Sequence, residues 1–329
     1  MNYHISDEFK QEFARKAIRN AQGKYELTVL VGNGFDLGLG LDTHYSDFLN
    51  RYLKHGFPVR TEAIKAMKDD IRRQRDEMSD SWADAEMAFA KLDFSSYPHK
   101  EGAVGAFAEC EGDFTEALTN YLLDEEQRFY IPPERKSEAT NKFVVQLQKL
   151  LSSKLPKLNE ANNVNLEFFN FNYTSTLDQL LSGDVVSLES DDATQKQCRF
   201  NIGSVHHIHG RLSNSTIVFG VDDSDQIADR IIAAASQQVG YLVKSELDTT
   251  LQINELDQFY NRILDSDMIV LFGLSYGRSD RSIWQSIFDA MQRSPLLEVV
   301  LCGHAKEPPI VNGAAMSLRL TSMEQQRFA

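Results

Sequence analysis

The chain has 329 residues, of which 42% are hydrophobic and 25% charged, as is usual for a globular protein with one large or two smaller domains. Its formal net charge of −14 repels phosphate backbones and therefore disfavours nucleic acid as a partner. The three cysteines lie far apart and form no Cys-x-x-Cys pair, which argues against a disulfide framework and a cysteine zinc site.

The sequence shows no targeting or membrane segment. The first residues lack the apolar core of a signal peptide, and no apolar run approaches the roughly 20 residues that a membrane span needs. We therefore expect a cytoplasmic protein without a membrane partner.

Apolar runs predict a parallel sheet interrupted by a long helical segment. Helical patterns separate most of the predicted strands, which are 26–31, 166–171, 204–209, 216–219, 268–274 and 298–302. Such alternation favours a parallel sheet covered on both faces. The segment between the first two strands is almost wholly helical and too long for a simple crossover. We predict an α/β fold with a nucleotide-binding core (1–54 and 161–329) and a large helical insertion or lid (55–160).

The first strand ends in a glycine turn followed by an acid. This turn lacks the third glycine and the later acid of a dehydrogenase fingerprint, but it still predicts a strand-to-helix turn that faces a phosphate or ribose. A tight turn without a ligand is the alternative. The candidate binding residues here are Gly32, Asn33, Gly34, Phe35 and Asp36.

Two later strands also end in polar clusters. The Asn172 amide can donate and accept hydrogen bonds at once, which suits a water molecule or a ribose hydroxyl. Gly273 and Ser275 suit a ribose or phosphate contact. Ser279 and Asp280 open the next helix, so capping explains at least one of them. The alternative for each is a residue that only fixes its own turn.

Three histidines lie in the predicted strand 204–209, near its end. Alternation along a strand would put His207 and His209 on one face and His206 on the other. His209 precedes a glycine, and an imidazole suits proton transfer at neutral pH. A hydrogen-bonded core histidine is the alternative, and no metal is expected. Asp84 and Glu86 are interpreted mainly as helix surface, with Glu86 facing the crevice as the minor alternative.

Taken in order, these blocks resemble the AbiH family of bacterial phage abortive-infection proteins. The blocks that carry the resemblance are Gly32-Asn-Gly-Phe-Asp-Leu37, Thr43-His-Tyr-Ser-Asp-Phe48, Trp82-x-Asp-x-Glu86, Phe171-Asn-Tyr173, His207-Ile-His-Gly210 and Gly273-Leu-Ser-Tyr276. They cover most of the chain, and their order is more specific than any one of them.

The family in turn resembles the sirtuin-type NAD-binding fold. That resemblance implies that Asn172 holds the attacking water or the nicotinamide ribose and that His209 is the general base. It implies a dinucleotide site lined by Gly32, Asn33, Gly34, Phe35, Asp36, Tyr173, Gly273 and Ser275. The four-cysteine module of sirtuin deacetylases is missing, and Thr174 and Val221 replace a sirtuin Asp and Glu. These departures count against protein deacetylation more than against NAD binding or simple hydrolysis.

The resemblances together imply a phage-defence protein that hydrolyses NAD to nicotinamide and ADP-ribose, an NAD glycohydrolase whose partner is a small-molecule nucleotide. A non-catalytic nucleotide sensor that signals through its helical insertion would use the same crevice. An RNA-cleaving toxin is disfavoured by the acidic composition and the lack of a clear carboxylate metal set. A homo-oligomer and a phage-derived trigger are further partners left open by the sequence.

Overall fold

The computed structural model describes residues 7–54, 59–77, 84–154, 163–182, 199–214, 216–239, 242–251, 253, 255–275, 277–294, 297–302 and 316–317. Its main sheet has the parallel strands β1 (Lys24–Val31), β2 (Asn163–Asn170), β3 (Arg199–His207), β6 (Met268–Phe272) and β7 (Glu298–Cys302). Their order is β3-β2-β1-β6-β7, and the short β8 (Met316–Ser317) pairs antiparallel with β7. The predicted α/β class and parallel sheet are confirmed.

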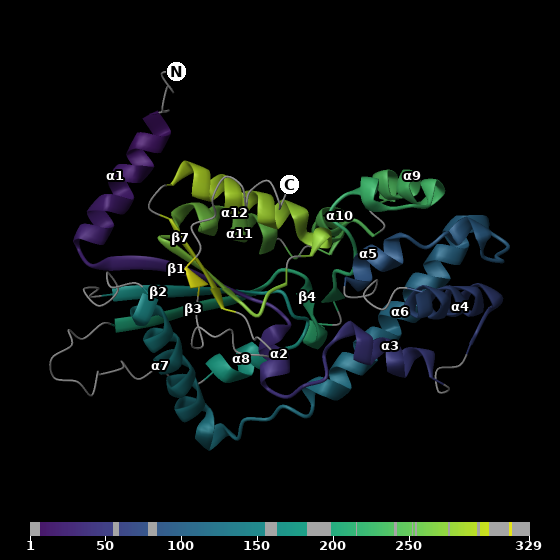
Figure 1. Ribbon diagram of the computed structural model, residues 1–329, viewed down its shortest axis with the longest axis horizontal. Helices are drawn as coiled ribbons and strands as arrows, with labels where there is room; N and C mark the ends of the chain where they lie inside the picture. The colour runs from purple at the N-terminus through teal and green to yellow at the C-terminus, as the bar shows by residue number, and fades with distance from the viewer. Residues whose placement is uncertain are drawn as a thin grey trace.

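Alternation along β1 sends its side chains to two separate cores. Leu27, Val29 and Val31 belong to one cluster and Leu30 to the other. The first cluster is covered by α2 (Gly34–Gly38), α7 (Lys136–Lys154) and α8 (Thr176–Leu181). The second is covered by α11 (Glu255–Asp265) and α12 (Arg281–Arg293), which lie above the sheet in Figure 1. Helix α1 (Asp7–Ala21) leads into β1.

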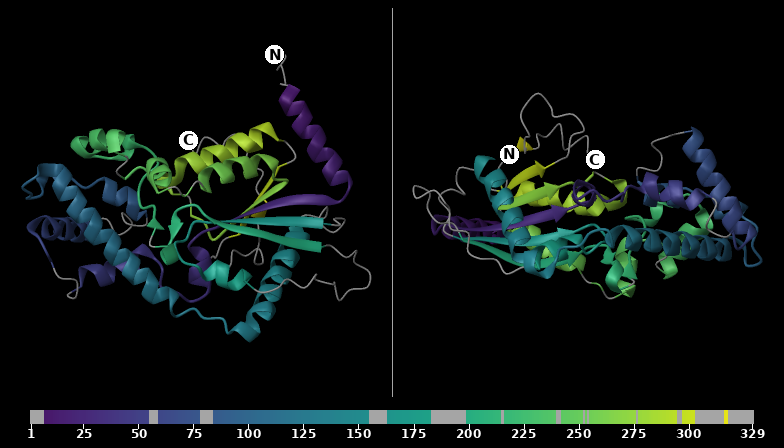
Figure 2. Two further views of the ribbon diagram at one scale, coloured as in Figure 1. Left: turned by 180° about the vertical axis from the view of Figure 1, so that it is seen from behind. Right: turned by 90° about the horizontal axis from the view of Figure 1, so that it is seen from below.

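A layer of helices lies beyond the carboxyl ends of the strands. It consists of α3 (Tyr45–Leu53), α4 (Glu62–Glu77), α5 (Ala85–Ala90), α6 (Gly102–Glu126) and α9 (Arg230–Val239). All three views place these helices at one end of the sheet rather than over its faces (Figures 1 and 2). We call them the helical layer.

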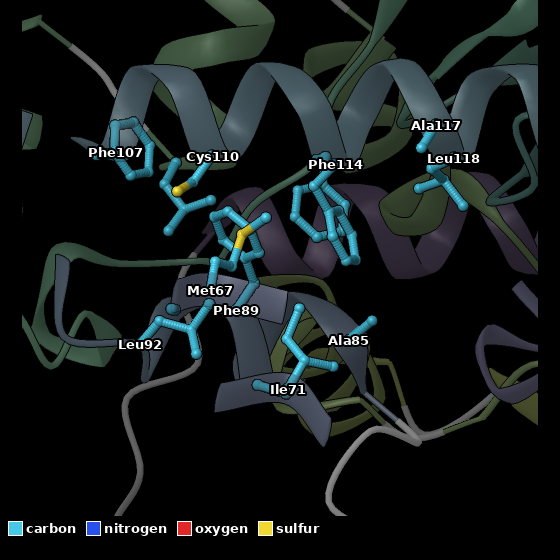
Figure 3. Packing of buried hydrophobic residues seen from close by; sticks show 14 of the residues in the cluster. Met67, Ile71, Ala85, Phe89, Leu92, Phe107, Cys110, Phe114, Ala117 and Leu118 are labelled. Carbon is cyan, nitrogen blue, oxygen red and sulfur yellow. The ribbon is translucent and has the colours of Figure 1, made fainter. Parts of the chain in front are cut away.

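The helical layer has its own aromatic core. Phe89 of α5 and Phe114 of α6 lie 5.1 Å apart between ring centroids, and Met67 and Ile71 of α4 pack beside them (Figure 3). Phe48 and Tyr52 of α3 join the same cluster, although α3 precedes residue 55. Val144 and Leu147 of α7 pack instead on the sheet. The exact limits of the helical insertion stay a prediction. By its packing, α3 belongs with the helical layer, whereas α7 belongs with the sheet.

Two local predictions are wrong. The run 216–219 is not a strand of the parallel sheet, because β5 (Thr216–Ile217) pairs antiparallel with β4 (Gly210–Arg211) in a separate two-stranded sheet. Gly210 turns the chain at a φ of +75°, which separates β4 from β3. Helix α10 (Lys244–Thr250) was not predicted. No helix in the described part of the chain combines the length and apolar character of a membrane span.

Candidate active site

The two glycine turns at the ends of β1 and β6 pack directly against each other. Gly32 N–H donates to Phe272 O at 2.9 Å, and Gly34 N–H donates to Gly273 O at 2.8 Å. A Cβ on Gly34 would lie 2.7 Å from Gly273 Cα. Glycine is therefore required here for the close approach of two backbones, and these two N–H groups are already engaged. Gly273 itself has a φ of +60°.

Asp36 forms a buried clasp with two threonines. It is 1% exposed, and its two carboxylate oxygens accept hydrogen bonds from Thr174 Oγ1 at 2.6 Å and Thr176 Oγ1 at 2.5 Å. Burial raises the pKa of Asp36, while the two hydroxyls act in the opposite direction. This Asp36 clasp ties α2 to the loop after β2.

Asn172 lies over the end of β1. Its Nδ2 donates to Gly32 O at 3.2 Å, and its backbone N–H donates to Asn170 Oδ1 at 3.0 Å. It borders a cavity of about 80 Å³ that we call the asparagine cavity. The polar or aromatic residues that line this cavity are Asn33, Asp36, Thr43, Tyr45, Phe48, Phe171, Asn172, Tyr173 and Thr174. Phe35 packs edge-on against Phe143 and Phe272.

Each of the three histidines contacts different acidic side chains. β3 ends at His207, so His209 lies beyond the strand, and the prediction that His207 and His209 share a strand face is wrong. His206 lies between Glu167 and Glu255, at 2.8 and 2.7 Å. His207 Nε2 lies 2.8 Å from Asp178 Oδ2. His209 Nε2 lies 3.0 Å from Asp280 Oδ1 and is the only one of the three that borders a cavity described here.

His209 belongs to a buried group of charges. Lys244 Nζ lies 2.7 Å from Asp280 Oδ1 and 3.3 Å from Glu86 Oε1. Glu86 is 6% exposed and also accepts from Ser279 Oγ at 3.0 Å and from the Tyr173 hydroxyl at 3.4 Å. We call Glu86, Lys244, Asp280 and His209 the Lys244 centre. The interpretation of Glu86 as mainly helix surface is wrong. Asp280 occupies the N-cap position of α12, but its side chain makes no capping hydrogen bond there.

The pKa values in the Lys244 centre follow from burial and charge. Burial raises the pKa of Glu86, and although Lys244 lowers it the net shift is upward. Burial also raises the pKa of Asp280, but Lys244 and His209 outweigh it, so the net shift is downward. Burial lowers the pKa of Lys244, and its two carboxylate partners reverse that effect. Asp280 is therefore the carboxylate of the centre and Lys244 its ammonium.

A cavity of about 120 Å³ adjoins this centre, and we call it the histidine cavity. Apolar side chains of Ile208, Val218, Leu256 and Ile283 form part of its wall. Its polar wall consists of His209, Asp222, Lys244, Ser245, Tyr260, Asp280 and Ser282. For scale, an engineered cavity of about 150 Å³ binds benzene, so the histidine cavity has room for about one ring.

The predicted residues thus converge on one edge of the sheet but divide between two cavities. Asn172 and His209 line different cavities that share no lining residue. The residues on either side of Asn172 connect them, because the Phe171 and Tyr173 rings lie 5.4 and 6.3 Å from the His209 ring. Ser275 is exposed, and Trp82, Cys198 and Tyr276 lie outside the described residues. In the described ranges no three histidine, cysteine or acidic side chains gather as a metal site would require.

Sequence reasoning missed Lys244 altogether. The residue begins a short helix in a polar stretch, where a lysine is ordinarily exposed, and both carboxylates that it contacts are distant in the sequence. The signal that the sequence offered was the apolar neighbourhood of Glu86, which stands between Ala85 and Met87 and is followed by Ala88, Phe89 and Ala90.

The sheet topology defines an α/β protein with two cavities at the carboxyl edge of its parallel sheet. The family described as Bacteriophage abortive infection AbiH matches residues 28–300. That range is most of the chain, so the protein belongs to the AbiH family, and its role is in abortive infection by bacteriophage. No curated protein matches the chain.

Proposed function

We propose that the protein binds NAD at the carboxyl edge of the sheet and hydrolyses it to nicotinamide and ADP-ribose, with His209 as the general base. The observation that carries this proposal is the buried imidazole–carboxylate pair, His209 Nε2 at 3.0 Å from Asp280 Oδ1, on the wall of a cavity. A carboxylate at one ring nitrogen fixes the orientation of the imidazole and stabilises its protonated form.

The position of the site supports a nucleotide as the ligand. In open parallel sheets, ligands bind outside the carboxyl ends of the strands where the strand order reverses, which here is between β1 and β6. The two glycine turns fill that point, and the two cavities lie beside it. Each cavity is smaller than the roughly 300 Å³ at which ligand pockets begin. Neither cavity therefore holds a whole dinucleotide. The histidine cavity has room for about one ring, and the rest of the ligand must extend outside it.

The proposed reaction makes few demands on the protein. Water attacks the anomeric carbon of the nicotinamide ribose, the bond to the pyridinium nitrogen breaks, and nicotinamide leaves with the bonding electron pair. His209 takes the proton lost by the water. Asn172 would hold the ribose from the asparagine cavity, where its amide already bonds Gly32 O. Because the leaving group is a neutral amine, no general acid is needed, and base catalysis typically contributes about 10²–10⁴-fold.

The test is nicotinamide release from NAD by the full-length protein, alone and in extracts of phage-infected cells. His209→Ala is expected to lower the rate by about 10²–10⁴-fold, and Asn172→Ala to lower it as well. His99→Ala is the matched control, because His99 lies in the helical layer beside Glu109 and borders neither cavity. No turnover in either setting, together with full phage protection by the His209 and Asn172 variants, would refute the enzyme proposal.

The second candidate is a nucleotide sensor without turnover. It is favoured by one contact: Glu86, which bonds Lys244, comes from α5 of the helical layer, so the site and that layer share a buried ion pair. Calorimetry separates the candidates. Tight NAD binding with no nicotinamide release supports the sensor, and release supports the enzyme.

A further inference from the structure

Lys244 is held in place by an unfavourable backbone conformation. Leu242 is 2% exposed and has a φ of +60°, a region that L-residues with bulky side chains rarely adopt. Its carbonyl accepts from Val221 N–H at 2.7 Å, and Lys244 N–H donates back to Val221 O at 2.8 Å. A Cβ on Gly220 would lie 2.4 Å from Leu242 O, so only glycine permits this approach. Strain of this kind often marks a functional segment, and here it delivers Lys244 to the interior.

The Lys244 ammonium joins two carboxylates from different parts of the fold. Glu86 belongs to α5 in the helical layer, whereas Asp280 precedes α12 on the sheet. The Lys244 and Glu86 side chains are 6% and 8% exposed. Charges this deeply buried are screened little by water, so each acts strongly on its neighbours.

His209 and Lys244 contact the same carboxylate oxygen of Asp280. Asp280 Oδ1 contacts Lys244 Nζ at 2.7 Å and His209 Nε2 at 3.0 Å. The Asp280 carboxylate therefore stands between the positive charge of Lys244 and the imidazole. Glu86 contacts the same lysine through Oε1 at 3.3 Å. The other titratable groups of the described residues that face the centre are Asp84, Tyr45 and Tyr173 on the side of the helical layer, and Asp222 and Tyr260 on the wall of the histidine cavity.

We propose that Lys244 and Glu86 are positioning residues that adjust, with opposite signs, the pH at which His209 takes up a proton. Lys244 opposes protonation of the imidazole and keeps Asp280 ionised, whereas Glu86 favours protonation. This inference deepens the proposed function and rests on it for the role of His209 as the base.

The downward shift of the pKa of Asp280 agrees with this arrangement, because Lys244 and His209 overcome the effect of its burial. The upward shift of the pKa of Glu86 shows that the same lysine does not fully offset the burial of the second acid.

The experiment is a pH titration of the histidine side chains by NMR, on full-length protein carrying ¹⁵N-histidine. The His209 signal is identified by its loss in His209→Gln. In Lys244→Met this signal is expected to titrate about one pH unit or more higher than in the native chain, and in Glu86→Gln about one unit lower. Lys244→Arg keeps the charge and is expected to restore the native titration. Lys142→Met is the matched control, because Lys142 pairs with Glu138 on the exposed face of α7.

Shifts of equal sign, or no shift in the two variants, would overturn the inference. If Lys244→Met does not fold, Glu86→Gln decides alone: a downward shift supports the inference and an unchanged titration overturns it. Nicotinamide release measured on the same samples keeps the two proposals apart. Opposite shifts without native turnover refute the proposed hydrolysis only, whereas turnover with an unmoved titration refutes the roles of Lys244 and Glu86 only.

Discussion

Asp36 and Asp280 are two carboxylates at the same edge of the sheet whose partners differ in kind. Asp36 is bound by two neutral hydroxyls, Thr174 and Thr176, and its pKa is raised by burial. Asp280 is bound by an ammonium and an imidazole, and its pKa is lowered despite burial. Hydroxyl partners fix a loop without providing charge, whereas cationic partners maintain a carboxylate in the interior. The difference separates the Asp36 clasp, which is held by neutral partners, from the Lys244 centre, which holds opposite charges in the interior.

The comparison is tested most strongly at Lys244. Lys244→Met leaves Glu86 and Asp280 buried without their cation, and we expect the free energy of unfolding to fall by about 3–5 kcal/mol at pH 7. Urea denaturation measures it. Lys142→Met removes an exposed lysine–glutamate pair and is expected to cost about 0.5 kcal/mol or less. An equally small loss in both variants would mean that the Lys244 centre is no more strongly coupled than a surface pair.

The glycine turn beside the Asp36 clasp gives the next effect. Gly34→Ala puts a methyl group 2.7 Å from Gly273 Cα, so we expect a loss of about 2–3 kcal/mol as the two turns are forced apart. Gly38→Ala, in the same helix, meets no atom within 4 Å and is expected to be neutral or to stabilise by up to about 1 kcal/mol. Thermal unfolding of both variants measures the contrast. Equal melting temperatures would contradict the close contact.

Thr176→Val tests whether the clasp depends on its hydroxyls. The valine keeps the shape of the threonine but removes the donor to Asp36 Oδ1, at an expected cost of about 1–2 kcal/mol in urea denaturation. Thr249→Val is the control, because its hydroxyl bonds only Ser245 O within its own helix in the described structure. We expect a change of about 0.5 kcal/mol or less there. A larger loss of stability at Thr249 than at Thr176 would contradict a stabilising role for the hydrogen bond to Asp36.

The smallest effect is the difference in pH dependence between the two carboxylates. The raised pKa of Asp36 means that the folded chain retains a proton that the unfolded chain loses, so its stabilising contribution falls as the pH rises from about 4. The lowered pKa of Asp280 has the opposite sign, and its contribution is lost as the pH falls below about 4.

Asparagine variants at the two positions measure this difference. The stability lost in Asp36→Asn is expected to shrink as the pH rises from about 4 to 7, and that lost in Asp280→Asn to shrink as the pH falls from about 4 to 3. One proton changes stability by at most about 1.4 kcal/mol per pH unit. Unfolding by urea at several pH values gives both slopes, and slopes of the same sign would contradict the assignment.

The sequence predicted the sheet well because its strands are continuous apolar runs. All five parallel strands and the convergence of Asn172, Gly34 and Gly273 at one edge follow from that pattern and from strand direction. The end of β3 was harder to predict, because the strand stops at His207 and His209 lies in the turn that Gly210 makes. Periodicity predicts that a strand is present, but it does not predict the residue at which the strand ends and a turn begins.

The Lys244 centre could not be predicted, because its members come from segments that meet only in three dimensions. Glu86 alternates with alanines and methionine in a short helix, Lys244 follows a leucine at positive φ, and Asp280 looks like an N-cap. Each has a common local explanation. Only the packing of the helical layer against the sheet shows that these local explanations are incomplete.

Helix α6 has a mechanical consequence for this arrangement. Its 25 residues form a rod of about 37 Å. At its far end Gly102 begins the helix, and at its near end Glu126 accepts from Ser175 N–H at 2.7 Å, three residues after Asn172. Hydrogen-bonded helices resist compression along their axis. A displacement of the helix at Gly102 would therefore be transmitted along its axis to the loop beside the asparagine cavity.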